Sequence, residues 1–481
     1  MNALLRTPLL YLCLLITGAV FAGCDSNPSG VEPVDITVNL AFSEGYDSAA
    51  AAGTRVTLTN ISSQETFEAE VTEEGQASFQ DVPAGDYNVS AVLTLDRQTV
   101  FELTGNYPDK DELSFNGTVS DVRINQNTEP LTVELTAGRL GDLVIKQIYY
   151  AGSDIIEGAG FRDQYLSIYN NSNRDINLDG LYVMGVHGNR TPDGENSQYL
   201  TEDGQFDWNQ SVGMPDSVNA NEDFLYAKYI YQIPEDGTPD VLPPGESVVI
   251  AQNALNHKQP YVNAEGDTVS AGDPSLTVDL SGADYEVYLA DQIDDPQPSD
   301  LDNPNVPNLR SIFIFGDDFI LDPLGRDAYA LFRTDTPASD FEAYAEPTER
   351  DVTGNTTLYP QIPTDWIVDA VETQPAPTDD QIPRKLQNRL DAGYTFVPGD
   401  FYSSQSVIRL LSKDQEDRSI LEDTNNSEEN FTFLEKATPR AMPPQTANTP
   451  TGTQRQRLRT KRERAISLDT FESRWAPRVN R

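Results

Sequence analysis

The sequence predicts an all-β protein built as two tandem immunoglobulin-like β-sandwiches, the second with long loop insertions. Three observations carry this prediction. The chain contains 31 glycines and 32 prolines, its apolar runs are short and often alternate with polar residues, and turn residues separate these runs every ten or so positions. With 481 residues, it is long enough for two or three domains with sizeable cores.

Residues 1–23 are predicted to be a secretory signal peptide. Arg6 supplies the positive charge, Leu9–Val20 supply the short apolar stretch, and the small residues before Cys24 close it. The closing letters FAGC resemble the lipobox of bacterial lipoproteins, with phenylalanine in place of the usual aliphatic residue. The resemblance implies that Cys24 is diacylated and becomes the first mature residue. The alternative is an ordinary signal peptide, cut just before the cysteine or one residue earlier.

Charge is distributed unevenly along the chain. The net charge of −44 becomes −51 for residues 24–440 once the basic tail (+6) and Arg6 (+1) are set aside. Such a surface repels nucleic acid and anionic lipid. Only 8 of the 33 basic residues are lysines, and an acidic, lysine-poor chain resembles proteins of salt-loving bacteria. The alternative is that the acids form a cation site.

After a tether over residues 24–33, residues 34–136 are predicted to form the first sandwich. Alternating apolar residues mark its strands, as in Ile36, Val38, Leu40 and Phe42, in Tyr87, Val89, Ala91, Leu93 and Leu95, and in Leu131, Val133 and Leu135. The stretches 75–79 (GQASF) and 82–89 (VPAGDYNV) resemble the signature of carboxypeptidase-regulatory-like and collagen-adhesin B-type domains. That resemblance implies a spacer or stalk.

Residues 137–441 are predicted to form the second sandwich. The stretches 141–152 (GDLVIKQIYYAG), 163–172 (DQYLSIYNNS) and 176–181 (INLDGL) predict one antiparallel meander. They resemble the start of lamin-tail domains. Residues 186–244 and 335–365 are rich in Asp, Pro, Gly and Thr, and are predicted to be surface loops. Residues 442–481 are predicted to be a linker and a basic, disordered tail.

Further stretches extend the resemblance across most of residues 34–440. They include 242–251 (LPPGESVVIA), 302–309 (DNPNVPNL) and 423–427 (DTNNS). Taken together, they resemble an uncharacterised family of bacterial lipoproteins, domain of unknown function 4876. The family resemblance implies a place in the cell envelope, with the outer membrane favoured, beside a TonB-dependent uptake receptor. It does not say which face of the membrane carries the protein.

Catalytic motifs are absent from the sequence. We find no H-E-x-x-H, G-x-S-x-G, Walker A, G-x-G-x-x-G or C-x-x-C pattern, and no cofactor is predicted. His187 and His257 are the only histidines, and a lone histidine in a turn is usually a hydrogen-bonding residue. Asp294, Asp295, Asp300 and Asp302 share one loop and are weak candidates for binding a hard cation, because carboxylates are its preferred ligands.

An aromatic cluster in the first predicted loop is the candidate binding surface. Trp208, Tyr226, Tyr229 and Tyr231 stand there among polar residues, where they could contact a surface glycan or a peptide. The alternative is that these rings pack into the sandwich. The sequence therefore predicts a lipid-anchored binding or scaffold protein. Two alternatives stay open: a secreted hydrolase with a carboxylate pair in the second domain's loops, and a purely structural surface protein.

Overall fold

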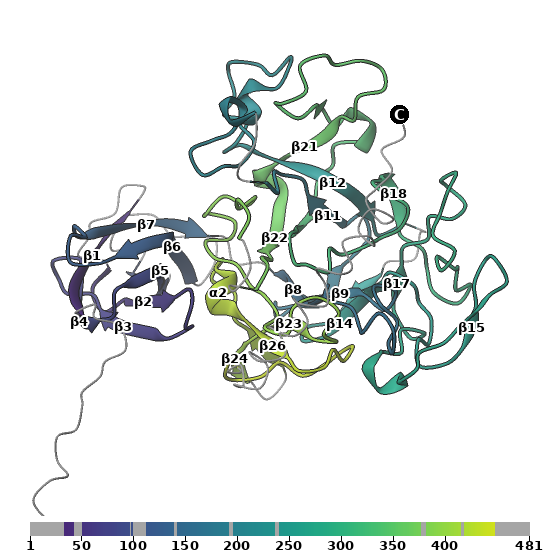
Figure 1. Cartoon of the computed structure of the whole chain (residues 1–481), viewed down its shortest axis with the longest axis horizontal. Helices are drawn as coiled ribbons and strands as arrows, with labels where there is room; N and C mark the ends of the chain where they lie inside the picture. The colour runs from purple at the N-terminus through teal and green to yellow at the C-terminus, as the bar shows by residue number, and fades with distance from the viewer. Residues whose placement is uncertain are drawn as a thin grey trace, which may run out of the picture.

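The structure is a computed structural model (Figure 1). It describes residues 33–42, 51–96, 98–99, 112–138, 142–191, 196–235, 240–376, 381–414 and 418–447. The signal peptide, Cys24 and the basic run after residue 450 lie outside these ranges, as do all but the last residue of the predicted tether. No helix in the described ranges is long and apolar enough to cross a membrane.

The first unit is one seven-stranded sheet that folds over on itself. Its order is β3-β2-β5-β6-β7-β1-β4, and β3 and β4 contact each other across the fold. The pair β1–β7 is parallel, whereas the other neighbours are antiparallel. The strands are β1 Val34–Phe42, β2 Arg55–Asn60, β3 Thr66–Glu70, β4 Gln76–Val82, β5 Gly85–Asp96, β6 Glu112–Ile124 and β7 Leu131–Gly138.

Alternation along these strands builds the first core. On β5, Tyr87, Val89 and Ala91 are buried in one apolar cluster that draws only on residues between 34 and 135. Asn88 and Ser90 point to the opposite face, because successive side chains of a strand alternate. The period-two pattern in the sequence therefore marked the core of this unit directly.

The second unit packs two sheets against each other. The six-stranded sheet has the order β17-β14-β9-β8-β23-β26, and the seven-stranded sheet has the order β20-β21-β12-β11-β19-β22, with β18 beside β12. Strands of the first sheet are β8 Leu143–Tyr149, β9 Tyr165–Asn170, β14 Ser247–Ala251, β17 Tyr285–Glu286, β23 Ser406–Arg409 and β26 Phe431–Leu434. Those of the second are β11 Tyr182–Val186, β12 Phe224–Gln232, β18 Arg310–Phe313, β19 Ala328–Phe332, β20 Ala343–Tyr344, β21 Tyr359–Pro363 and β22 Ile367–Glu372.

Short elements fill the connections of the second unit. They are β10 Ile176–Asn177, β13 Val241–Leu242, β15 Tyr261–Val262, β16 Thr268–Val269, β24 Leu411–Asp414, β25 Ser419–Leu421, the helix α2 Ser427–Asn430, and the 3-10 turns Ser197–Tyr199, Trp208–Gln210, Pro274–Leu276, Ala338–Asp340 and Thr364–Trp366. The prediction of an all-β sandwich protein is confirmed by these sheets.

Both faces of both large sheets are covered. The main apolar cluster lies between the sheets and includes Ile168 of β9 and Leu331 of β19. A second cluster covers the outer face of the seven-stranded sheet and includes Met184 and Leu386. A third covers the outer face of the six-stranded sheet. Strands such as β9 are consequently buried at every residue, so apolar and polar residues do not alternate along them.

The prediction that residues 186–244 are a surface loop is wrong for their second half. Phe224–Gln232 form β12, which lies between β11 and β21 in the seven-stranded sheet. Residues 335–365 likewise contribute β20 and β21 to that sheet. Many polar residues surround these strands, so the sequence did not predict them. Two short apolar segments form strands here because they pack against the rest of the domain.

The two units meet through the polar outer face of the first. Ser90 Oγ donates to Glu429 Oε1 at 2.6 Å, and Asn116 Nδ2 donates to the Thr424 carbonyl at 2.6 Å. Asn88 Nδ2 also donates to the Tyr394 hydroxyl at 3.1 Å. Figure 1 shows the same meeting point, with α2 beside the strands of the first unit. Hydrogen bonds therefore hold the joint.

Candidate functional site

The four aromatic residues proposed as a binding surface are buried. Trp208 is 3% exposed, Tyr226 and Tyr229 are each 2% exposed, and Tyr231 is 0% exposed. Tyr229 and Tyr231 belong to the cluster between the two sheets, whereas Trp208 and Tyr226 pack together on the other side. The prediction of an exposed contact surface is therefore wrong. β12 places these rings within the protein, where they fill the core and a satellite cluster.

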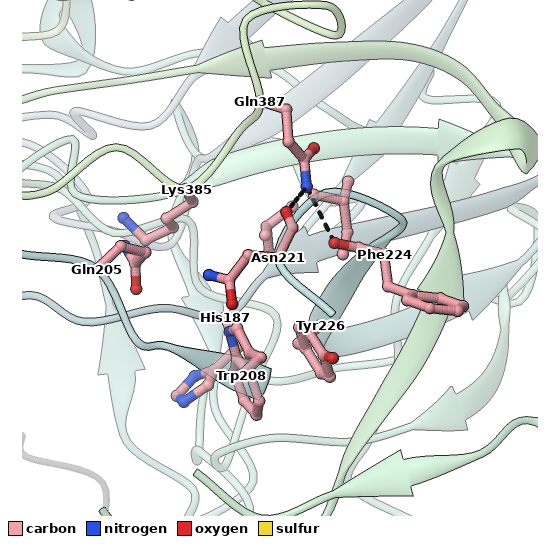
Figure 2. Close-up of a pocket in the computed structure, with 10 residues that line it drawn as sticks. His187, Gln205, Trp208, Asn221, Phe224, Tyr226, Lys385 and Gln387 are labelled. Atoms are coloured by element: carbon pink, nitrogen blue, oxygen red, sulfur yellow. Dashed lines mark hydrogen bonds between the residues drawn. The ribbon is translucent and has the colours of Figure 1, made fainter. Parts of the chain in front are cut away.

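Trp208 and Tyr226 instead line a small cavity (Figure 2). Its volume is about 20 Å³, which is room for about one water molecule. The end of β11, the segment around the turn Trp208–Gln210, the start of β12 and the segment after residue 381 meet there. The lining side chains are Val186, His187, Gln205, Trp208, Asn221, Phe224, Leu225, Tyr226, Lys385 and Gln387. We call it the Lys385 cavity.

Two pairs of parallel rings form the aromatic side of the Lys385 cavity. Trp208 stacks on Tyr226 with ring centroids 3.6 Å apart, and His187 stacks on Tyr359 at the same separation. His187 Nε2 lies 2.8 Å from Glu346 Oε1. Burial lowers the pKa of His187, although the Glu346 carboxylate opposes the shift. The imidazole is therefore neutral near pH 7 and donates its Nε2–H to Glu346.

Lys385 supplies a buried amine to this cavity. Its side chain lines the cavity, the residue is 8% exposed, and no described residue accepts a hydrogen bond from its Nζ. Burial lowers the pKa of Lys385, because desolvation disfavours the charged form. The carboxylate of Glu372 fixes the backbone here by accepting hydrogen bonds from the amides of Lys385 and Leu386.

Gly188 lets two cavity side chains approach the backbone closely. A Cβ at this position would lie 2.8 Å from Gln205 Oε1 and 2.9 Å from Lys385 Cγ. Figure 2 shows Gln205 and Lys385 beside each other on one side of the cavity. Glycine is therefore required for this part of the lining to pack as it does.

An ion-pair network centred on Asp327 lies close enough to Lys385 to act on its pKa. Asp327, which is 0% exposed, accepts hydrogen bonds from Arg190 and from Lys228 Nζ, the latter at 2.8 Å. Arg190 also pairs with Asp322 at 3.1 Å, and Arg326 pairs with the same carboxylate at 2.9 Å. Although burial alone would raise them, these cations hold the pKa values of Asp322 and Asp327 below the usual range.

The aspartates considered for a cation do not converge. Asp294 and Asp295 are exposed, and Asp302 bonds the exposed Asn308 at 2.8 Å. Asp300 turns inward, where its carboxylate accepts the Leu289 amide at 2.9 Å. Across the described ranges, no three His, Cys, Asp or Glu side chains gather as a metal site.

His257 is buried away from the Lys385 cavity. It is 2% exposed and its Nε2 lies 3.2 Å from the carbonyl oxygen of Asn253. Burial lowers its pKa to about 4, so the ring is neutral near pH 7. The structure thus gives this histidine the role of a hydrogen-bonding core residue.

Sequence reasoning found part of the cavity and missed its amine. Trp208 and Tyr226 were identified, although for an exposed surface, whereas Lys385, Gln205 and Gln387 were not. Lysine is scarce in this chain, with 8 in 481 residues, and Lys385 follows the apolar residues Ile382 and Pro383. That scarcity was the available signal, but Gln205 and Asn221, which line the cavity with Lys385, lie more than 150 positions away in the sequence.

Comparison with known proteins adds a family and three distant structural likenesses. Residues 243–439 match the model of a family described as protein of unknown function, DUF4876. The predicted resemblance to this family is thereby confirmed for residues 243–439, which are fewer than half of the chain. No curated protein matches the sequence.

The first structural likeness is a crystal structure of a DUF4876 family protein from Bacteroides thetaiotaomicron, with 22% identity, 87% of this chain and 99% of that chain covered, and a TM-score of 0.45. The second is fervidolysin from Fervidobacterium pennivorans, a keratinolytic enzyme related to subtilisin. It is 11% identical, the match covers 51% of this chain and 30% of that chain, and the TM-score is 0.16. The third is a fimbrial assembly protein from Parabacteroides distasonis, which is 11% identical, with 44% of this chain and 85% of that chain covered and a TM-score of 0.13. All three TM-scores lie below 0.5, so these likenesses carry no weight for function.

Proposed function

We propose that this chain, whose residues 243–439 match the DUF4876 family, is a lipid-anchored cell-envelope protein that binds a ligand through its second unit. The observation that carries the proposal is the run from Leu9 to Cys24, an apolar stretch that ends in FAGC. The remaining cysteine, Cys13, lies inside the predicted signal peptide. Cys24 is therefore the residue that would carry the lipid.

Binding rather than catalysis fits the groups in the second unit. Its buried carboxylates are engaged in holding the fold: Glu372 accepts backbone amides, and Asp391 accepts the Ser427 amide at 2.7 Å and the Ser427 hydroxyl at 2.6 Å. The Lys385 cavity offers a buried amine and aromatic walls, which orient a ligand rather than transform it. The ligand would then pass to a TonB-dependent uptake receptor in the outer membrane.

Membrane fractionation tests the anchor. Cys24→Ser should release the protein from membranes and abolish labelling by a radioactive or clickable fatty acid. The matched control is Cys13→Ser, which changes a cysteine of the signal peptide and should leave both readouts unchanged. Full membrane retention of Cys24→Ser would overturn the lipid anchor.

Affinity capture tests the receptor. The lipidated protein, purified from native membranes after chemical cross-linking, should bring a TonB-dependent receptor with it. Cys24→Ser, captured from the soluble fraction, is the control and should lose that partner. Recovery of the wild-type protein without any receptor would remove the accessory role and leave the anchor standing.

A further inference from the structure

Two polar atoms of residues that line the Lys385 cavity lack partners in the described part of the chain. They are the donor Lys385 Nζ and the acceptor Gln387 Oε1, and both are buried. Leaving either atom unpaired costs free energy, because it has lost its bonds to water. A group that enters the cavity and bonds with them would remove that cost.

The neighbouring amides are already engaged. Gln205 Oε1 accepts the Phe206 amide at 2.9 Å. Asn221 Nδ2 donates to the Phe206 carbonyl at 2.7 Å. Gln387 Nε2 donates to two backbone carbonyls, of Asn221 and Phe224, as the dashed lines in Figure 2 mark. The unmet capacity is thus one donor and one acceptor.

Charge argues against an anion as the occupant. The bases around the cavity, Arg190, Lys228, Arg326 and Lys385, are matched in number by the acids Asp322, Asp327, Glu346 and Glu372. The neighbouring His187 is neutral near pH 7. In addition, the body of the protein carries a net charge of −51, which repels anions at long range. The occupant is therefore a neutral group.

Size and hydrogen bonding then select a hydroxyl. A hydroxyl both donates and accepts, and the cavity of about 20 Å³ holds one such group. The cavity is bordered by the half-buried polar side chains of His187, Gln205, Asn221 and Gln387, and by the rings of Trp208 and Tyr226. Amides and an imidazole beside an aromatic ring suit a ligand with several hydroxyls and an apolar face.

We propose that the Lys385 cavity is the deepest subsite for a neutral saccharide, one hydroxyl of which accepts from Lys385 Nζ while a second, at the cavity's edge, donates to Gln387 Oε1. The saccharide ring lies at the cavity's edge, against His187 and Asn221. This inference rests on the proposed binding function and names its ligand class.

Fluorescence of Trp208 provides the readout, because this ring lines the cavity and stacks on Tyr226. The mature full-length chain with Trp366→Phe and Trp475→Phe leaves Trp208 as its only tryptophan. The probes are glucose, galactose, mannose and N-acetylglucosamine, with glucuronate as the anionic comparison. At least one neutral sugar should change the emission in a saturable way, and glucuronate should bind more weakly than glucose.

Variants then locate the binding site. Lys385→Met and Gln387→Ala should each weaken the best sugar about tenfold or more, since each removes one hydrogen-bond partner of the bound saccharide. Lys258→Met is the matched control, because Lys258 is exposed, and it should bind like the parent protein. Thermal unfolding of each variant checks folding, and Gln387→Ala carries the test if Lys385→Met does not fold.

Three results would overturn the saccharide subsite. They are no response to any of the four neutral sugars, tighter binding of glucuronate than of glucose, and unchanged affinity in Gln387→Ala. Gln387→Ala should also retain membrane anchoring and receptor capture. A failure of the subsite alone is thereby distinguished from a failure of the proposed function, in which anchoring or capture is lost by the parent protein itself.

Discussion

The two units of this protein bury different kinds of residue. The first encloses a single apolar cluster, and its strands keep polar residues on their outer face. The second covers both faces of two sheets and buries a network of ions, in which Lys228 pairs with Asp327 and Arg409 pairs with Asp369. Both are β-sandwiches, and the second contains the Lys385 cavity, which charged and aromatic groups line.

This difference shows what each unit depends on for stability. The stability of an apolar core depends on how well its side chains fill the space, because cavities and overpacking both destabilise the folded state. The stability of a buried ion pair depends on the presence of both partners, because removing one leaves the other charge buried without compensation. The following variants separate the two dependences, from the largest expected effect to the smallest.

The largest effect is expected from Lys228→Met in the second unit. It leaves Asp327 buried with Arg190 as its direct cation, and breaking a buried pair in this way costs about 3–5 kcal/mol. Differential scanning calorimetry should show the second unit unfolding several degrees earlier, while the transition of the first unit stays in place. Lys258→Met removes an exposed lysine and should shift neither transition. An equally stable Lys228→Met would mean that the network is not needed for folding.

Trp208→Ala should destabilise the second unit to a similar or slightly smaller extent. Loss of a buried aromatic ring typically costs about 3–5 kcal/mol, and Trp208 is 3% exposed. Phe115→Ala is the matched change in the first unit, where Phe115 is 1% exposed. Each variant should lower only its own transition in calorimetry. If Trp208→Ala melted like the parent, the ring would not belong to a packed cluster, and an exposed binding face would again be tenable.

Stability should also depend on pH through the second unit. Burial raises the pKa of Asp163, of Glu286 and of Glu428 to about 7 in each case. A carboxyl whose folded pKa lies above its unfolded value favours folding while protonated, so this stabilisation is present below about pH 4 and is lost as the pH rises through 7. The two histidines, whose folded pKa values are lowered, act in the opposite direction over the same window.

The carboxyls outnumber the histidines, so we expect the melting temperature of the second unit to be higher near pH 5 than at pH 8. Below about pH 4 the trend reverses, because the unfolded chain binds protons at Asp322 and Asp327, whereas the folded protein, in which their pKa values are lowered, keeps them charged. Asp163→Asn mimics the protonated form and should flatten part of the slope between pH 5 and 8. A melting temperature that rises steadily from pH 5 to pH 8 would contradict these assignments.

The sequence allowed much of the first unit to be predicted and little of the site in the second. Tyr87, Val89 and Ala91 alternate with polar residues, so the sequence alone marked their inward face. Tyr165–Asn170 are buried throughout, and such a strand carries no period that distinguishes its two faces. β12 lay within a stretch so polar that it resembled a loop.

The site itself depends on contacts that no local pattern records. Lys228 and Asp327 lie 99 positions apart, and Arg190 and Asp327 lie 137 apart. A sequence motif describes residues that are close along the chain, whereas this network is assembled by the order of the strands in the sheet. The family resemblance was found because its signatures are local turns and strand pairs. The buried lysine was missed because its partners are distant.

The smallest expected effect lies at the joint between the units. Ser90→Ala and Glu429→Ala each remove one side of a 2.6 Å hydrogen bond, and a bond of this kind couples two sites by about 1–2 kcal/mol. In a double-mutant cycle, the double variant should be less destabilised than the sum of the singles by about that amount.

The two calorimetric transitions should also move further apart in every variant, because the units then unfold with less mutual support. Glu422→Ala, which changes another glutamate of the second unit, should leave the separation unchanged. Strict additivity of the two substitutions would show that this bond does not couple the units, and that the Asn116–Thr424 and Asn88–Tyr394 hydrogen bonds hold the joint without it.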